Sequence, residues 1–182
     1  MDLKRSLQAC TQVLVDHVEE LTELDSAIGD GDHGLNMRRG ALAIQAKMAE
    51  LETKSLNDAL KTMGMTCMST VGGSSGPVFG TLMVTLGKEL PAQPASADVA
   101  RALAAGIAAL CKLGKVEVGQ KTLLDVLDPV QKVLAAGGDD FIVKPYNPAE
   151  LIAIIRAHLL RAALREKMQR DAAKRVSAGG TR

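Results

Sequence analysis

The chain has 182 residues, of which 47% are hydrophobic and only 2% aromatic, with eight methionines and no tryptophan. This length can bury a core as one domain, or as one domain with an appendage, and an aliphatic core favours packed helices over strands, which prefer aromatic and β-branched residues. The net charge of +1 excludes a global field that would recruit nucleic acid or a membrane surface, so neither is expected as a partner.

Three cysteines, Cys10, Cys67 and Cys111, are widely spaced, odd in number and free of CxxC pairs. This usage predicts reduced thiols in the core of a cytoplasmic protein. The sequence begins without a recognisable signal peptide and contains no apolar run of membrane-spanning length, which favours the same location.

Apolar residues recur every three or four positions along the first three quarters of the chain and predict six helices. The first two cover about residues 3–23 and 35–51. A third begins after Ser55, which is a suitable N-cap, and a fourth carries Phe79. The last two cover about residues 99–114 and 123–136.

An acidic segment interrupts this pattern between the first two predicted helices. In "LDSAIGDGDHGLN", Asp25, Asp30 and Asp32 cannot share one helical face, but the glycines between them permit a turn that brings the carboxylates together. Three carboxylates suit a hard cation such as Mg²⁺ or Ca²⁺, although the spacing is not that of an EF-hand. A solvated turn that caps the following helix explains the same residues equally well.

A second loop, "GGSSGP", leads directly into the fourth predicted helix. Glycine N–H groups, two hydroxyls and a helix N-terminus form an anion site, although the segment matches neither GxGxxG nor the P-loop. Taken alone, a tight turn between two helices explains it better. A third glycine loop, "GQKT" over Gly119–Thr122, also precedes a helix, and the acidic segment together with these loops indicates a metal–nucleotide site.

Three motifs, "ELDSAIGDGDHGLNMRRG", "TVGGSSGPVFGTLM" and "GQKTLLDVLDPV", resemble in order and spacing the nucleotide-binding L subunit of dihydroxyacetone kinase, over about residues 4–132. The resemblance implies an all-α antiparallel barrel of eight helices that binds ADP or ATP through two Mg²⁺ ions at one end. It also implies phosphoryl transfer to dihydroxyacetone or a similar short ketose held by a separate K subunit. The donor would be ATP, or a phosphotransferase-system partner that recharges bound ADP.

The resemblance also assigns site residues. It implies that Asp25, Asp30 and Asp32 ligate the metal ions. It implies nucleotide or phosphate contacts for a larger set, namely His33, Asn36, Gly73, Ser74, Ser75, Gly119, Thr122 and Leu124. Gln120 departs from the family pattern, because many members carry an aspartate there. The last two helices and the lid of the family are not recognisable after the sixth predicted helix, so an incomplete barrel of about six helices is expected.

The segment after the sixth predicted helix has a resemblance of its own. "LAAGGDDFIVKPYNPAELIAIIRAHLLRA", residues 134–162, is similar to the end of a response-regulator receiver domain, with Lys144 at the position of the receiver lysine. The phosphoacceptor aspartate and most of the strands of a receiver are missing, so no receiver activity is implied. The chain is therefore expected to be a fusion of a helical domain, residues 1–134, with a receiver-like tail, residues 135–182, that adds a strand-like segment and a helix.

Three functions are open at this point. The first is the nucleotide- and Mg²⁺-binding subunit of a dihydroxyacetone-type kinase. The second is a nucleotide-binding or scaffold protein that has lost catalysis together with the lid, and the third is a signalling adaptor whose tail docks on receiver partners. The large apolar share also favours self-association into a homo-oligomer.

Overall fold

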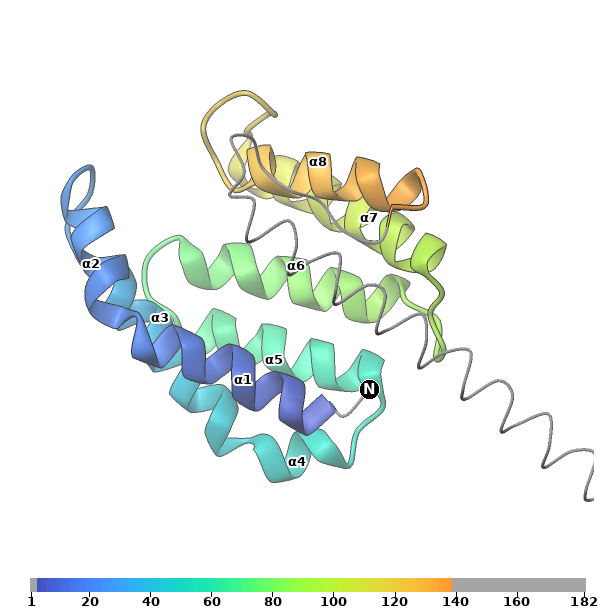
Figure 1. The fold of residues 1–182 in the computed structure, drawn as a ribbon, viewed down its shortest axis with the longest axis horizontal. Helices are drawn as coiled ribbons and strands as arrows, with labels where there is room; N and C mark the ends of the chain where they lie inside the picture. Colours follow the sequence, from blue (N-terminus) through green and yellow to red (C-terminus); the bar gives the residue numbers. More distant parts are fainter. Residues whose placement is uncertain (1–2, 139–182) are drawn as a thin grey trace, which may run out of the picture. The chain divides into compact units, whose positions relative to one another are not determined.

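A computed structural model describes residues 3–138, and within this range the chain forms eight α-helices and no β-strand (Figure 1). The helices are α1 (Leu3–Asp16), α2 (Val18–Ser26), α3 (His33–Ala46), α4 (Met48–Glu52), α5 (Leu56–Thr70), α6 (Ser75–Glu89), α7 (Ser96–Gly114) and α8 (Leu124–Ala135). The predicted all-α class is thus confirmed for the described residues.

Helices that lie near one another in the sequence pack side by side (Figure 1). Both α1 and α2 pack on α3, which packs on α5, and the series continues from α5 to α6, α7 and α8. The chain direction reverses at each step, so the array is antiparallel. As a result, the α2–α3, α5–α6 and α7–α8 loops lie at one end of the array, and the α4–α5 and α6–α7 loops lie at the other.

The expected count of six helices is wrong for this range, because two of the predicted helices bend and are divided. The first bends at His17, between α1 and α2, and the second at Lys47, between α3 and α4. The Leu21 N–H still donates to the His17 carbonyl at 3.0 Å, and the Leu51 N–H to the Lys47 carbonyl at 2.9 Å. The apolar repeat therefore runs through both bends, and periodicity alone does not reveal them.

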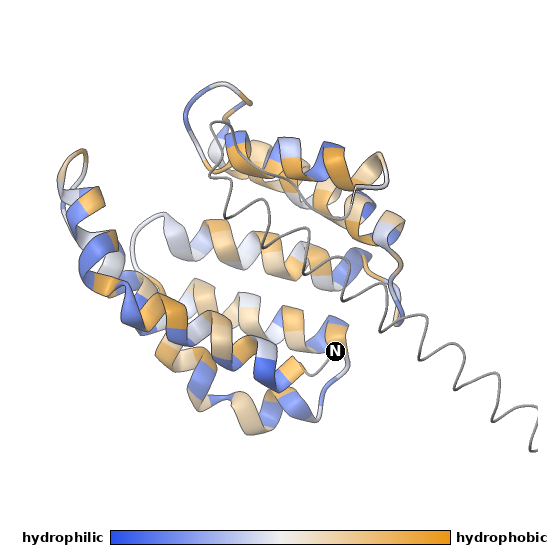
Figure 2. Ribbon diagram, viewed as in Figure 1, coloured by the Kyte–Doolittle hydropathy of each residue, from blue (hydrophilic) through white to orange (hydrophobic). Residues whose placement is uncertain are grey.

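The core is aliphatic and contains sulfur, as the composition predicts. Its central cluster comes from α3, α4, α5 and the residue after α5, and leucines of α1 and α2 pack against it. The cluster consists of Met37, Ile44, Leu51, Ala59, Met63, Cys67 and Val71. Figure 2 shows hydrophobic residues recurring along each long helix, which is the pattern expected when every helix buries one side against its neighbours.

The three cysteines differ in their surroundings. Cys67 is buried in the core, and this burial raises the pKa of its thiol. Cys10 is exposed on α1, and Cys111 is half-buried on α7. The expectation that all three lie in the core is therefore wrong for Cys10.

Helices α5 and α6 approach each other closely at two glycines. A Cβ atom on Gly64 would lie 2.7 Å from Cγ2 of Val84 and 2.8 Å from the carbonyl oxygen of Gly80. Such distances are shorter than van der Waals contact, so the crossing requires a residue without a side chain in α5. This close contact fixes α6, and with it the loop that precedes α6.

Several expectations fall outside the described residues. They are the strand-like segment of the expected tail around Phe141–Val143, the lysine matched to the receiver, Lys144, and the tail helix over 148–165. The expected domain boundary at residue 134 lies one residue before the end of α8, and because the second domain lies almost entirely beyond residue 138, the division stays a prediction. Between residues 3 and 138, no helix combines the length and the apolar character needed to cross a membrane.

Candidate functional site

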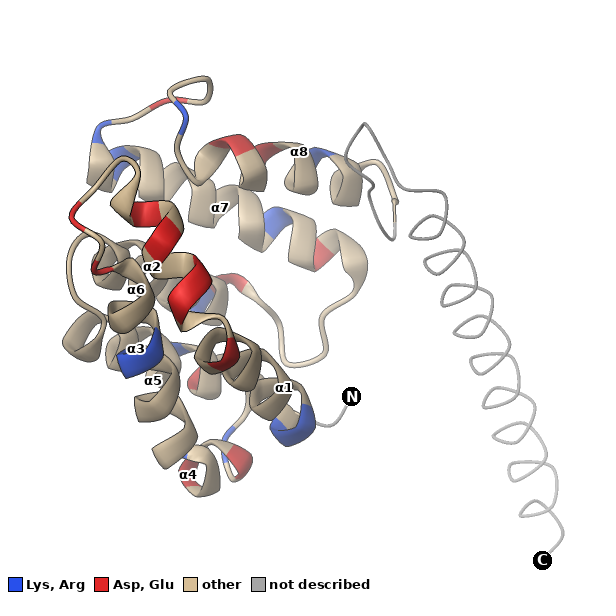
Figure 3. Ribbon diagram, turned by 60° about the vertical axis from the view of Figure 1, so that its left-hand side comes forward, with Lys and Arg blue, Asp and Glu red and all other residues tan. Residues whose placement is uncertain are grey.

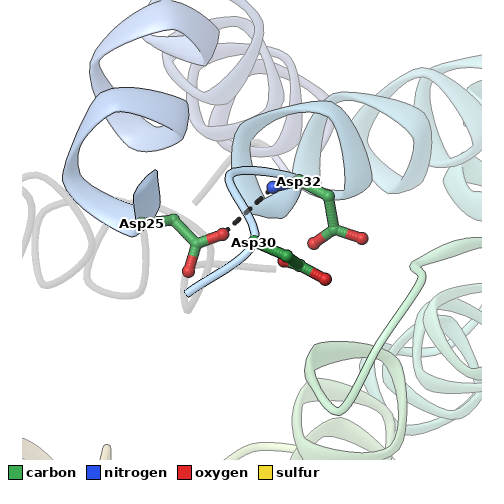
Figure 4. A group of neighbouring side chains, drawn as sticks. All are labelled: Asp25, Asp30 and Asp32. Carbon is green, nitrogen blue, oxygen red and sulfur yellow. Dashed lines mark hydrogen bonds between the residues drawn. The ribbon is translucent and has the colours of Figure 1, made fainter. Parts of the chain in front are cut away.

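The acidic segment forms the last turn of α2 and the loop before α3. Asp25 belongs to α2, Asp30 to the loop, and Asp32 is the N-cap of α3. One carboxylate oxygen from each lies within 4.8 Å of the other two (Figure 4). The structure thus brings together the three carboxylates that the sequence singles out. Such a set of oxygen donors fits a hard divalent cation, and these three residues would hold it.

Asp25 also shapes the loop in which the other two aspartates lie. Its Oδ2 accepts hydrogen bonds from the N–H of Asp32 at 3.0 Å and from the N–H of His33 at 3.2 Å. Gly31 has a φ of +73°, a left-handed conformation that glycine adopts without steric cost. Figure 3 shows acidic residues along α2 and the following loop. Carboxylates this close repel one another unless a positive group lies between them.

The α5–α6 loop lies next to the first turn of α3. Oγ of Ser75, the first residue of α6, is 3.3 Å from Nδ1 of His33, the first residue of α3. Gly73 has a φ of +62°, so this turn also uses the left-handed region. Gly72 packs on the buried Asn36 so closely that a Cβ atom would overlap the Asn36 amide. Asn36 therefore supports the loop from the α3 side.

The α7–α8 loop is held by a carboxylate in the first turn of α8. Oδ1 of Asp125 accepts a hydrogen bond from the Gly119 N–H, and Oδ2 accepts one from the Thr122 N–H at 2.8 Å. These hydrogen bonds, that of Gly119 foremost, lower the pKa of Asp125. Gly119 and Lys121 have φ values of +97° and +57°, and a left-handed lysine is uncommon because its Cβ crowds the backbone. Oγ1 of Thr122 accepts from the Leu124 N–H at 3.3 Å.

A cleft of about 750 Å³ lies between these loops and the adjoining helix ends. This volume is within the usual range for small-molecule sites. Its polar side chains come from His33, Ser74, Ser75 and Thr122. Apolar residues from α6, α7 and α8 form most of the remaining wall, including Pro77, Val78, Phe79, Leu110, Leu113, Leu124 and Val126. The cleft therefore combines a small polar region with a larger apolar one.

Three helices begin at this cleft. His33, Ser75 and Leu124 are the first residues of α3, α6 and α8, and all three line it. The first N–H groups of a helix have no acceptor within the helix, and the aligned peptide dipoles give this end a partial positive charge. The acidic segment borders the same place, because Asp32 directly precedes His33. The arrangement suits an anion that has an apolar part and is accompanied by a divalent cation.

Five of the predicted nucleotide-site residues line the cleft, namely His33, Ser74, Ser75, Thr122 and Leu124. Asn36, Gly73 and Gly119 are not part of its lining; they belong to, or support, the loops that form it. Gln120, the departure from the family pattern, accepts a hydrogen bond from the Glu117 N–H at 3.1 Å. The part that each of these residues plays toward a ligand stays a prediction.

Sequence reasoning missed two parts of this site. One is the apolar wall from α6 and α7, whose residues look like ordinary core positions in the periodic pattern. The other is Asp125. The T-x-x-D spacing of Thr122 and Asp125 is a helix-capping signal that would have placed this carboxylate at the start of α8, but its contact with Gly119 has no signature in the sequence.

The model of the DAK2 domain matches residues 27–175 of the chain. The chain belongs to the DAK2 domain family. The match continues well past residue 132, where the resemblance to the kinase subunit was expected to end, and it includes the whole segment compared with a receiver domain. The expectation of a fusion with a receiver tail thus has no support from the comparisons, and the DAK2 domain occupies most of the chain.

This DAK2 domain is similar to several named proteins. It is 42% identical over 115 residues to "PEP-dependent dihydroxyacetone kinase 1, ADP-binding subunit DhaL" of Listeria innocua, an alignment that covers 63% of this chain and 58% of that protein. It is 35% identical over 141 residues to "PEP-dependent dihydroxyacetone kinase, ADP-binding subunit DhaL" of Escherichia coli, with 76% and 67% covered. It is 29% identical over 177 residues to human "Triokinase/FMN cyclase", with 97% and 29% covered. The chain thus spans little more than half the length of the Listeria subunit.

Proposed function

We propose that the chain is the nucleotide- and Mg²⁺-binding subunit of a dihydroxyacetone-type kinase. The observation that carries the proposal is the juxtaposition of three carboxylates with a cleft at which α3, α6 and α8 begin. ADP or ATP has the two features that this juxtaposition requires, a polyanionic end that binds a divalent cation and a flat, largely apolar base. The names of the bacterial relatives, which are ADP-binding subunits, support the same function.

In this proposal Asp25, Asp30 and Asp32 hold Mg²⁺, with two ions expected. Bound Mg²⁺ neutralises negative charge on phosphate oxygens during phosphoryl transfer. The N–H groups at the start of α6, with the hydroxyls of Ser74 and Ser75, orient the phosphates. The remaining predicted residues, His33, Asn36, Gly73, Gly119, Thr122 and Leu124, complete the phosphate and base contacts or support the loops that make them. No side chain is assigned as a covalent nucleophile.

The acceptor in this proposal is a short ketose that a separate K subunit of dihydroxyacetone kinase presents to the bound nucleotide. The phosphoryl donor is ATP, or a phosphotransferase-system subunit that recharges bound ADP. The names of relatives from Listeria innocua and Lactococcus lactis include "PEP-dependent" and "PTS-dependent", which supports the second donor. In this proposal the chain works in the cytoplasm.

Calorimetric titration of ADP into the full chain, with Mg²⁺ and with EDTA, tests the proposal. We expect binding that requires Mg²⁺, because carboxylates and phosphates repel each other without a cation between them. Equal affinity in both buffers would contradict the metal part of the proposal, and no binding in either would contradict all of it. A phosphotransfer assay with a K subunit then separates a working kinase subunit from a nucleotide-binding scaffold without catalytic activity.

A further inference from the structure

The α7–α8 loop makes part of the cleft wall, but the contacts that hold its shape lie outside the cleft. Thr122, Leu123 and Leu124 line the cleft, whereas Asp125 does not. The two hydrogen bonds from Gly119 and Thr122 to the Asp125 carboxylate join the two ends of the turn that leads into the cleft wall. The turn thus depends on a carboxylate that is not part of the cleft lining.

The backbone of this turn requires such a restraint. Gly119 and Lys121 are both left-handed, with φ of +97° and +57°, and a non-glycine residue keeps this conformation only where the surroundings impose it. Among the described residues, the Asp125 carboxylate makes the contacts that span this turn from Gly119 to Thr122. Without them, we expect Thr122 to leave its place beside the start of α8.

We propose that Asp125 is a positioning residue for the nucleotide, which acts by holding the α7–α8 loop in the shape that places Thr122 and Leu123 against the bound ligand. This inference rests on the proposed function, because the ligand in question is the nucleotide of that proposal. The depressed pKa of Asp125 agrees with a carboxylate that stays ionised while it accepts both N–H groups.

A simpler alternative is that Asp125 only caps the start of α8. The chain contains a second capping aspartate that serves as a control for this alternative. Asp98, in the first turn of α7, accepts the N–H of Ala95, three residues before it, at 3.0 Å, as Asp125 accepts that of Thr122. It also forms an exposed ion pair with Arg101 at 3.0 Å, and such surface pairs contribute little to stability. The start of α7 lies at the end of the array opposite the α5–α6 and α7–α8 loops (Figure 1), which contribute residues to the cleft lining. If Asp125 were only a cap, the Asp125→Asn and Asp98→Asn variants would have the same effects.

The experiment measures MgADP affinity by calorimetry and thermal stability by scanning calorimetry for the full-length parent and the two variants. We expect both variants to melt at somewhat lower temperature than the parent. We expect Asp125→Asn to bind MgADP about tenfold more weakly, and Asp98→Asn to bind it like the parent, because only the first loses the restraint on the cleft wall. A tenfold change in affinity corresponds to about 1.4 kcal/mol. Hydrogen exchange of the Gly119 and Thr122 amides should accelerate in the Asp125→Asn variant alone.

Unchanged affinity in Asp125→Asn would overturn the inference and leave the proposed function intact. Equal losses of affinity in both variants would also overturn it, since the effect would then follow from stability. A parent chain that binds no MgADP would overturn the proposed function and the role of Asp125 together, so the two kinds of failure are distinguished by the parent alone.

Discussion

Replacement of Asp30 by asparagine should stabilise the protein in the absence of Mg²⁺ and at the same time abolish the Mg²⁺-dependent binding of ADP that we propose. Asp30 is exposed, and its carboxylate lies within 4.8 Å of those of Asp25 and Asp32. At this distance two unit charges in water repel each other by about 0.9 kcal/mol. Screening at physiological ionic strength reduces that value to roughly half, so removal of both interactions should add about 1 kcal/mol to the free energy of unfolding.

For a chain of this size, such a gain corresponds to a rise in melting temperature of about 2–4 °C. Differential scanning fluorimetry without divalent cations measures the rise, which should shrink as salt is added. With Mg²⁺ present, the parent should melt at a higher temperature than the variant. A ligand that binds the native state raises the melting temperature, and the variant lacks one of the three carboxylates that would bind the ion.

Asp25→Asn provides the matched comparison, because it relieves the same repulsion between carboxylates but also weakens hydrogen bonds that Asp30 does not make. Oδ2 of Asp25 accepts two N–H groups at the start of α3. The amide oxygen of asparagine can still accept both, but a neutral hydrogen bond contributes roughly 0.5–1.5 kcal/mol where one to a charged group contributes roughly 1.5–3 kcal/mol, so the loss over two bonds exceeds the relieved repulsion. This variant should therefore melt below the parent even without Mg²⁺. If Asp30→Asn fails to melt above the parent at low salt, or if both variants shift in the same direction, the reasoning from charge and hydrogen bonding is refuted.

The remaining predictions concern packing, a turn and a thiol. Gly64→Ala should lower the free energy of unfolding by roughly 1–3 kcal/mol in urea titrations, because the new methyl group meets Val84 across the α5–α6 contact. An unchanged urea midpoint would show that α5 and α6 move apart at no cost in stability. Gly73→Val should lower the melting temperature, because its φ of +62° strains a β-branched residue, and it should also weaken MgADP binding, because a side chain there keeps the loop N–H groups from the proposed phosphate site. A variant equal to the parent in affinity would make the loop a simple turn. Cys10 should react with a thiol reagent in the native protein, whereas Cys67, whose thiol pKa is raised by burial, should react only on unfolding; rapid labelling of both would contradict the described core.

Helix positions could be predicted from the sequence because one buried face repeats along each of them. The divisions at His17 and Lys47 could not, because hydrogen bonds continue across both bends and leave the repeat intact. The carboxylate cluster was predictable for a different reason. Glycine and aspartate alternate within a few residues, and only a tight turn is compatible with that pattern.

The cleft itself was less accessible to sequence reasoning. Its polar members follow glycine motifs that can be read directly, but Leu110 and Leu113 reach it only because α7 packs between α6 and α8. A periodic apolar residue looks the same whether it faces a core or a ligand. Of the two hydrogen bonds to Asp125, the one from Thr122 could be predicted from the capping pattern. The one from Gly119 could not, because it depends on a left-handed turn that no local sequence pattern specifies.

The packing of each helix on helices that lie near it in the sequence bears on how the chain folds. Contacts between segments close in the sequence require little loop closure, and helical proteins of this kind fold rapidly. Pairs of adjacent helices can form in turn as the chain is synthesised. The cleft forms later than these pairs. Its walls come from α3, α6, α7 and α8, so it is complete only after α8 has packed. The site is therefore assembled in the last packing step of the described helices. We expect the proposed nucleotide to bind only after all of these helices have packed.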